Sequence, residues 1–135
     1  ITKAIPNALN NLSENNWFEA AESIMTTDTA PNAYSKIINL NDRDVTITGI
    51  CKGSGMIYPN MATMLAFIAV DINIPNDLLN ELISEVCEKS FNCISVDGDT
   101  STNDSFILMG IPSDKDFMLK KMEVFTELMV LEIVL

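Results

Sequence analysis

KGSGMIYPNMATMLAFIAVD, residues 52–71, is the stretch around which the rest of the chain is organised. It opens with a glycine-bearing loop, passes through Pro59 and Asn60 to Ala62 and Thr63, and ends in an apolar run typical of a buried strand. A Gly/Pro loop that ends on a small residue can hold a threonine hydroxyl in an exposed and strained place. The stretch therefore makes Thr63 a candidate nucleophile.

The chain contains no histidine, so a nucleophilic hydroxyl has no imidazole to use as its base. An N-terminal threonine supplies its own base, the free α-amine, whose ordinary pKa is roughly 7.7–8.0. This chemistry requires that the chain be cut between Ala62 and Thr63. On the residues alone the alternative stays open, because a threonine beside an apolar run is more often an ordinary strand residue.

Composition favours one domain with a single core, since the chain has 135 residues and is 47% hydrophobic. It begins with Ile1 and stops in an apolar run at Leu135 that carries no helix-ending signal, so we expect it to be a piece of a longer protein. The net charge of −11, with Arg43 as the only arginine, argues against nucleic acid and anionic membranes as partners.

Cysteine usage and hydropathy predict a cytoplasmic protein. Cys51, Cys87 and Cys93 are odd in number and lack CxxC spacing, which argues against a zinc site and a disulfide framework. No apolar run reaches membrane-spanning length, and no signal peptide is recognisable. We expect buried free thiols, no bound metal and no membrane partner.

The hydrophobic spacing predicts an α+β or α/β layered domain. Ser13 is the expected N-cap of a helix that ends near Thr26, after one or two helical turns within residues 1–12. A hairpin is expected to bring Lys52 to one edge of a sheet. The expected strands are 34–40, 45–51, 64–72 and 105–109, and the remaining expected helices begin at Pro75 and Ser113.

Three polar segments invite a functional interpretation. The cluster TTDTAP at 26–31 is either a turn after a helix or a patch that donates hydrogen bonds to a ligand. Lys52 precedes its glycines, which excludes a nucleotide-binding P-loop. It is either a solvated lysine or a group that holds a substrate carboxylate by charge-assisted hydrogen bonds. The loop 97–104 lacks the glycine and glutamate of a calcium-binding EF-hand, so we interpret it as a polar wall.

The segments AAESIMTTDT (20–29), 52–71 and 90–104 resemble the ornithine acetyltransferase (glutamate N-acetyltransferase) family of arginine biosynthesis. PNMATML and VDGDTSTND are highly specific motifs within them. The resemblance covers most of residues 1–112 in order and spacing, whereas the last two dozen residues match only loosely.

This resemblance implies a layered αββα fold, incomplete in this chain, and a precursor that cleaves itself between Ala62 and Thr63. Residues 1–62 would be the C-terminal part of the α chain, and residues 63–135 the N-terminal part of the β chain. Thr63 would be the catalytic residue, and Thr29, Lys52 and Thr63 would bind substrate.

The implied reaction transfers acetyl from N-acetylornithine to glutamate through an acetyl-threonine intermediate. No cofactor or metal is implied, although acetyl-CoA is a possible acetyl donor. The implied assembly is an α2β2 heterotetramer in the cytoplasm, with small-molecule substrates and neither nucleic acid nor membrane as partners.

The sequence departs from the family pattern in several places. The oxyanion-hole Thr-Gly pair would precede Ile1, the glutamate of a GEGATK motif and a C-terminal Asn and Thr would follow Leu135, and Asn32 replaces a common lysine. Losing an oxyanion donor costs about 100- to 1000-fold in rate. A related N-terminal-nucleophile aminopeptidase and an inactive truncated fragment therefore remain as alternatives.

Overall fold

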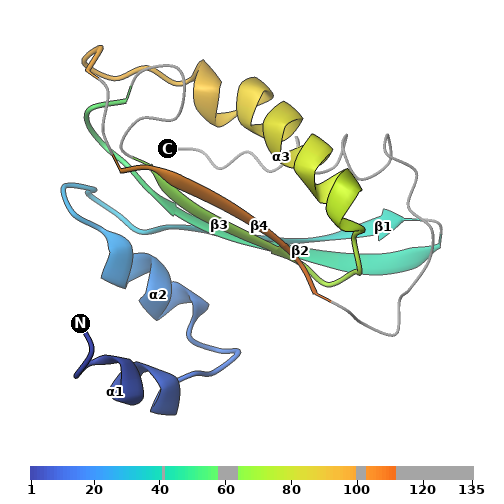
Figure 1. Cartoon of the computed structure of the whole chain (residues 1–135), viewed down its shortest axis with the longest axis horizontal. Coiled ribbons are helices and arrows are strands. Elements are labelled where there is room, and N and C mark those ends of the chain that lie inside the picture. The colour runs from blue at the N-terminus through green and yellow to red at the C-terminus, as the bar shows by residue number, and fades with distance from the viewer. Residues whose placement is uncertain (41, 58–63, 100–102, 112–135) are drawn as a thin grey trace.

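A computed structural model of the chain describes residues 1–40, 42–57, 64–99 and 103–111, and these residues form a mixed α/β structure (Figure 1). Four strands alternate irregularly with three α-helices and one 3-10 turn, which confirms the expected fold class. The elements are α1 (Ile5–Asn10), α2 (Trp17–Ile24), β1 (Asn32–Leu40), β2 (Arg43–Lys52), β3 (Leu65–Val70), α3 (Asn76–Lys89), η1 (Phe91–Cys93) and β4 (Ser105–Gly110).

The strands form one sheet in the order β1-β2-β3-β4. β1 and β2 are an antiparallel hairpin in which Asn32 pairs with Cys51, and β3 is antiparallel to β2. β4 runs parallel to β3 after the α3 crossover, as a parallel pair requires. The predicted hairpin is confirmed, but β2 is an inner strand, so Lys52 leaves from the end of the sheet and not from an edge strand.

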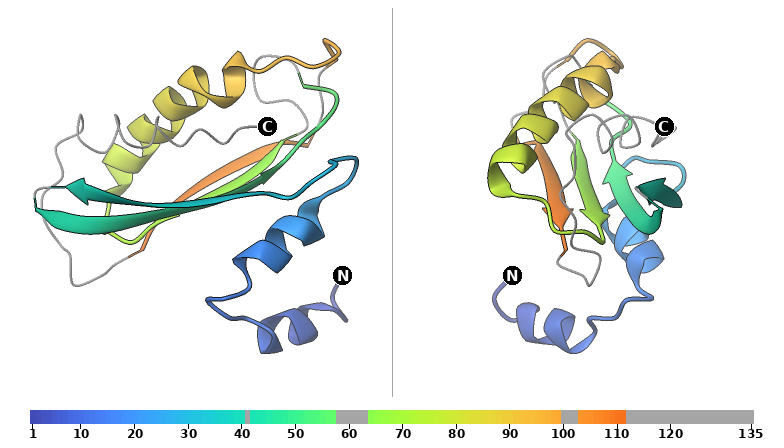
Figure 2. Two further views of the ribbon diagram at one scale, coloured as in Figure 1. Left: turned by 180° about the vertical axis from the view of Figure 1, so that it is seen from behind. Right: turned by 90° about the vertical axis from the view of Figure 1, so that its right-hand side faces the viewer.

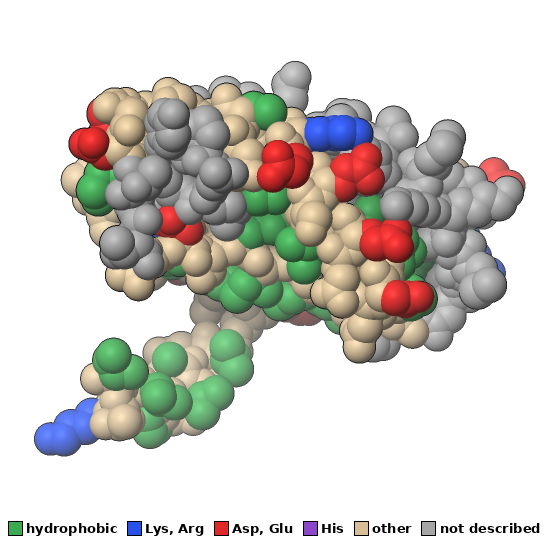
Figure 3. All heavy atoms as spheres, turned by 45° about the horizontal axis from the view of Figure 1, so that its top comes forward, with side chains coloured by type: hydrophobic (Ala, Val, Ile, Leu, Met, Phe, Trp, Pro, Cys, Tyr) green, Lys and Arg blue, Asp and Glu red, His purple; other side chains and the backbone are tan. Residues whose placement is uncertain are grey.

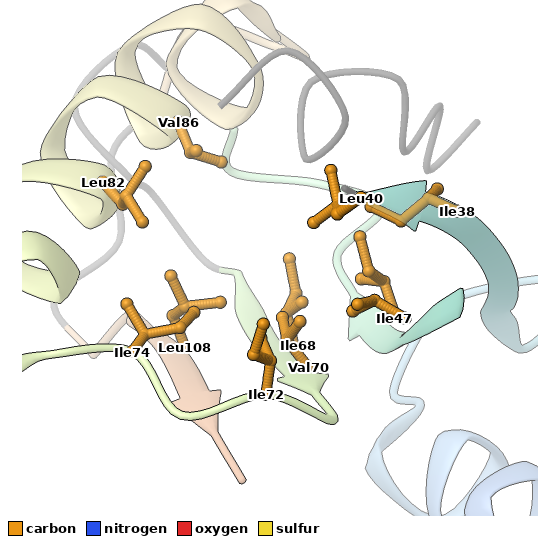
Figure 4. Close-up of a cluster of buried hydrophobic side chains, with 11 residues drawn as sticks. Ile38, Leu40, Ile47, Ile68, Val70, Ile72, Ile74, Leu82, Val86 and Leu108 are labelled. Atoms are coloured by element: carbon orange, nitrogen blue, oxygen red, sulfur yellow. The ribbon is translucent and has the colours of Figure 1, made fainter. Parts of the chain in front are cut away.

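Helix α3 covers one face of the sheet and buries the main core (Figure 4). Leu82 and Val86 of α3 belong to the same buried cluster as strand side chains that alternate toward this face, such as Ile47 and Ile68. On its other side α3 carries Glu81, Glu85 and Glu88, and Figure 3 shows acidic side chains gathered over this outer surface. The cluster comprises Ile38, Leu40, Val45, Ile47, Ile68, Val70, Ile72, Ile74, Leu82, Val86 and Leu108.

A second apolar cluster lies at the end of the sheet where β2 stops. Its buried members are Cys51, Ile57, Met64, Ala66, Cys87 and Phe91. Phe91 packs on Phe106 with the ring centroids 5.3 Å apart and the planes tilted by 54°. This cluster matters for function because it buries the residues on both sides of segment 58–63.

The opposite face of the sheet carries α2, with α1 farther out (Figure 2). Helix α1 has no buried residue, whereas α2 buries Ala21. Much of this face stays open, since Ile37, Ile107 and Met109 are exposed. The described residues thus form one sheet with helices on both faces, and the second sheet of an αββα fold is not among them.

The start of α2 differs from the sequence prediction. The N-cap of α2 is Asn16 and not Ser13, because the Ser13 hydroxyl instead accepts a hydrogen bond from the Asn15 amide (3.2 Å) in the preceding turn. The helix expected from Ser113 lies outside the described residues. Within the described ranges, no helix is both long and apolar enough to cross a membrane.

Candidate functional site

The end of α2 and the end of β2 meet in a polar corner organised by Asp28. The Asp28 carboxylate accepts a hydrogen bond from the Gly53 amide (2.8 Å) through one oxygen and from the Thr26 amide (3.1 Å) through the other. Helix α2 ends at Ile24 with Met25 as its C-cap, so the Thr26 amide lies outside the helix. One side chain therefore fixes the TTDT segment and joins it to the glycine loop after Lys52.

The electrostatics of this corner favour a charged Asp28. Partial burial by itself raises the pKa of the carboxyl, but hydrogen bonds from the amides of Gly53, Thr26 and Asp28 itself, and the charge of Lys52, outweigh it. The pKa of Asp28 consequently lies below its ordinary value of 3.8. The corner holds an ionised carboxylate at neutral pH.

Two further contacts join the same segments. The hydroxyls of Thr27 and Ser54 are 2.5 Å apart, and the Lys52 ammonium group lies 3.5 Å from the Thr26 hydroxyl, at the outer limit of a hydrogen bond. Lys52 is half-buried and Thr29 is exposed. The structure thus brings Lys52 next to the TTDT segment that contains Thr29, as a shared substrate site would require.

A second set of contacts fixes the chain on the near side of residues 58–63. The Asp97 carboxylate accepts a hydrogen bond from the Met56 amide (2.8 Å), and the next residues, Ile57 and Val96, exchange two backbone hydrogen bonds of 3.1 and 2.6 Å. Met56 and Asp97 both have positive φ angles, of 54° and 63°. This uncommon backbone conformation in two non-glycine residues is typical of a tightly specified turn.

On the far side of residues 58–63, Asp104 performs the corresponding task. Its carboxylate accepts a hydrogen bond from the Met64 amide (2.8 Å), and the Met64 carbonyl accepts one from the Ser105 amide (3.0 Å). Ile57 and Met64, which border the segment, are each only 2% exposed and belong to the same apolar cluster. Both flanks of the segment are therefore anchored by the loop 97–104.

Ala62 and Thr63 themselves lie outside the described residues, so their predicted roles in cleavage and catalysis stay predictions. Sequence reasoning missed the three aspartates that organise the described part: Asp28, Asp97 and Asp104. Each lies in a motif that the sequence marks as polar, and a carboxylate in such a loop is a common partner for backbone amides. The polar motifs mark these aspartates as candidates, but the sequence does not reveal which backbone amides they bind.

Cys51 lies at the end of β2 beside the corner but is not a nucleophile. The residue is fully buried, and burial, followed by the charge of Asp28, raises the pKa of its thiol to about 12. A thiol with that pKa is almost entirely protonated at neutral pH, and the thiolate is the reactive form. Cys51 and Cys87 are buried, as expected, whereas Cys93 is exposed, so the expectation of buried thiols was wrong for Cys93.

An apolar groove of about 420 Å³ lies elsewhere, between α2 and the open sheet face. Trp17, Ala20 and Ile24 form one wall, and Ile50 and Phe67 are part of the other. It includes neither Thr29 nor Lys52. The groove is therefore separate from the polar corner.

Comparisons with known proteins identify the family. A model of the ArgJ family matches residues 1–132. The "Arginine biosynthesis bifunctional protein ArgJ" of Colwellia psychrerythraea is 55% identical over 105 residues, which is 78% of this chain and 25% of that protein. The protein of the same name from Psychrobacter arcticus is 54% identical over 109 residues, 81% of this chain and 27% of that protein.

The chain spans about a quarter of the length of the curated relatives it matches. The family match nevertheless covers almost the whole chain, including the TTDT corner, the glycine loop and the loop 97–104. The resemblance inferred from the motifs is thereby confirmed. The chain belongs to the ArgJ family.

Proposed function

We propose that this chain carries the self-cleavage site and part of the active site of a glutamate N-acetyltransferase (ornithine acetyltransferase). Membership of the ArgJ family supports this function, as does the name of the two relatives, which assigns them to arginine biosynthesis. The observation that carries it is the Asp28 bridge, which joins the TTDT segment to Lys52-Gly53. Two remote motifs of the family thus form one polar corner.

The proposed first reaction is self-cleavage. The hydroxyl oxygen of Thr63 attacks the carbonyl carbon of Ala62, an ester bond forms, and the Ala62–Thr63 C–N bond breaks as the nitrogen takes up the hydroxyl proton. Water then hydrolyses the ester, which frees the Ala62 carboxylate and restores the Thr63 hydroxyl. The division into residues 1–62 and 63–135 follows from this step.

The proposed second reaction is acetyl transfer through a covalent intermediate. The Thr63 amine takes the proton from its own hydroxyl as the oxygen attacks the acetyl carbon of N-acetylornithine. The C–N bond breaks, and ornithine leaves with that proton. The amine of glutamate then attacks the acetyl group, a proton returns to the threonine oxygen, and N-acetylglutamate leaves.

Lys52 and Thr29 are the proposed substrate-binding residues beside Thr63. The half-buried ammonium group of Lys52 can bind the α-carboxylate that both substrates carry, by a charge-assisted hydrogen bond. Thr29 follows Asp28 directly, so the Asp28 bridge limits where its hydroxyl can lie. We regard acetyl-CoA as a possible second acetyl donor and propose no other cofactor.

We further propose the α2β2 assembly and a cytoplasmic location. The assembly is supported only by the family resemblance. The location is supported by three free thiols, Cys51, Cys87 and Cys93, since unpaired cysteines are usual in a reducing compartment.

The test uses a chimaeric full-length ArgJ protein in which this chain replaces the matching quarter of a relative. Intact mass is measured for the wild-type sequence, for Thr63→Ala, and for Thr2→Ala as a matched control at an exposed position. We expect two fragments that divide between Ala62 and Thr63 in the wild type and the control, and one mass in Thr63→Ala. A single mass in all three proteins would overturn the proposal.

Cleaved protein is then assayed for acetyl transfer from N-acetylornithine to glutamate. Ping-pong kinetics and an added acetyl mass on the fragment that begins with Thr63 are expected. Release of amino-terminal residues from small peptides, without acetyl transfer, would instead identify the aminopeptidase. Cleavage without either activity would support the self-cleavage step but contradict the proposed acetyltransferase activity.

A further inference from the structure

We propose that Asp104 is a positioning residue for Thr63, acting through the backbone of Met64. This inference rests on the proposed function and deepens it, since it names the group that fixes the chain next to the nucleophile. The family motif VDGDTSTND contains Asp104, but its sequence does not say which of its four carboxylate and amide side chains does this.

The backbone of Met64 is held at both of its polar groups. Its amide donates to the Asp104 carboxylate over 2.8 Å, and its carbonyl accepts from the Ser105 amide over 3.0 Å. The Met64 side chain is 2% exposed and packs in the apolar cluster with Ile57 and Phe91. Residue 64 is therefore fixed by two hydrogen bonds and a buried side chain.

Covalent geometry passes this restraint to Thr63. The nitrogen that donates to Asp104 is bonded directly to the carbonyl carbon of Thr63, and the peptide unit that joins the two residues is planar. A hydrogen bond at that nitrogen therefore restrains Met64 at the bond through which it joins the preceding residue.

The restraint gains importance after cleavage. Both the nucleophile and its base belong to Thr63 in the proposed mechanism, and the new N-terminus has lost its link to Ala62. The peptide bond to Met64 is then its one covalent tether. Misplacement of a reacting group by about 1 Å can cost on the order of 100-fold in rate.

Asp97 and Asp99 provide contrasts within the same loop. Asp97 holds the Met56 amide, on the flank that cleavage separates from Thr63. Asp99 is exposed, and its backbone amide donates to Asp97. Asp99→Asn therefore makes the same change of charge as Asp104→Asn without removing an acceptor from Met64.

The experiment compares Asp104→Ala, Asp104→Asn and Asp99→Asn in the chimaeric full-length protein. Hydrogen exchange of the Met64 amide reports the contact itself, and the cleavage rate, kcat and KM report its effect. For Asp104→Ala we expect faster exchange and a kcat reduced by roughly 10- to 100-fold, with KM changed by less than about twofold. Asp104→Asn keeps an acceptor oxygen, so it should recover part of kcat, and Asp99→Asn should match the wild type.

Several outcomes would overturn the inference. Wild-type kcat in Asp104→Ala would do so, as would a loss of kcat in Asp99→Asn equal to that in Asp104→Asn. If Asp104→Ala does not fold, Asp104→Asn decides: a folded variant with faster Met64 exchange and unchanged kcat contradicts the positioning role. Failure of the proposed function looks different, because the wild type would then neither cleave nor transfer acetyl while Met64 exchange still responds to Asp104→Ala.

Discussion

Replacing Asp28 should loosen the polar corner in a way that depends on pH. Asp28→Ala removes the acceptor of two backbone amides, and the two do not cost the same. Gly53 is buried, so its amide cannot turn to water, whereas Thr26 is exposed and can. The main cost is therefore one buried, unpaired donor.

The expected cost of Asp28→Ala follows from the loss of the partner of the Gly53 amide. A buried donor without a partner costs about 1–3 kcal/mol. The same energy corresponds to a roughly 5- to 150-fold faster exchange of the Gly53 amide if exchange proceeds through local opening. Asp28→Asn keeps one acceptor oxygen but loses the charge, so it should fall between the wild type and Asp28→Ala.

The pH dependence of stability distinguishes a role of the Asp28 charge from a role of its side-chain volume. The pKa of Asp28 is lowered in the folded chain, so its contribution to stability is complete above its ordinary value of 3.8 and is lost as the pH falls through the lower, folded value. The difference between wild type and Asp28→Asn should therefore be present at pH 7 and disappear at pH values below the folded pKa. Thermal unfolding followed by circular dichroism measures the change in stability, and NMR measures the exchange rate of the Gly53 amide.

Asp99→Asn is the matched control, because it removes one exposed carboxylate at the same cost in net charge. It should leave Gly53 exchange unchanged. The reasoning fails if Asp28→Asn and wild type differ equally at pH 7 and at low pH. It fails also if Gly53 exchange does not respond to Asp28→Ala.

Two further predictions concern the scaffold. Gly110→Ala places a Cβ 3.1 Å from both the Ile72 carbonyl oxygen and the Ile74 amide nitrogen, so it should lower the free energy of unfolding by about 1–3 kcal/mol in chemical denaturation. Gly55→Ala, whose nearest neighbour is Asp97 at 3.4 Å, should cost less, and equal costs would contradict the packing argument. Iodoacetamide at pH 8 should label exposed Cys93 first and buried Cys51 only after unfolding. Intact mass and peptide mapping measure the order of labelling. Rapid labelling of Cys51 in the native protein would refute its burial.

The regular elements of this fold are visible in the sequence because each buries one face of a short periodic segment. Alternation from Val45 onward predicts β2, and the apolar spacing from Leu78 to Cys87 predicts α3. The helix starts are harder to predict, because several polar residues near a helix can serve as cap. Ser13 and Asn16 both have suitable side chains, and the turn before α2 engages Ser13.

The strand order was less accessible than the strands. The β1–β2 hairpin joins two strands that are adjacent in the sequence, so a short polar connection is enough to predict it. The position of β4 beside β3 instead depends on where the chain returns to the sheet after α3. Sequence reasoning therefore predicts the contents of the sheet but not that β2 is an inner strand. The same limit explains why Lys52 was expected at an edge.

The acidic residues show most clearly what a pattern cannot reveal. The excess of negative charge suggests a solvated surface, and Glu81, Glu85 and Glu88 on α3 fit that interpretation. Four aspartates have a different role, because each accepts a hydrogen bond from a backbone amide 25 or more residues away in the sequence. The pairs are Asp28 with Gly53, Asp71 with Thr46, Asp97 with Met56 and Asp104 with Met64.

A carboxylate in this role needs a backbone amide that is free to donate to it, and three of these four amides lie outside the strands and helices. Gly53 follows β2, Met56 lies before segment 58–63, and Met64 precedes β3. Three of the four contacts therefore gather on the one stretch, 52–64, that leads to Thr63 and past it. Charge that would otherwise only solubilise the chain is used there to hold its backbone, which is why neutralising these aspartates should impair the site more than the fold.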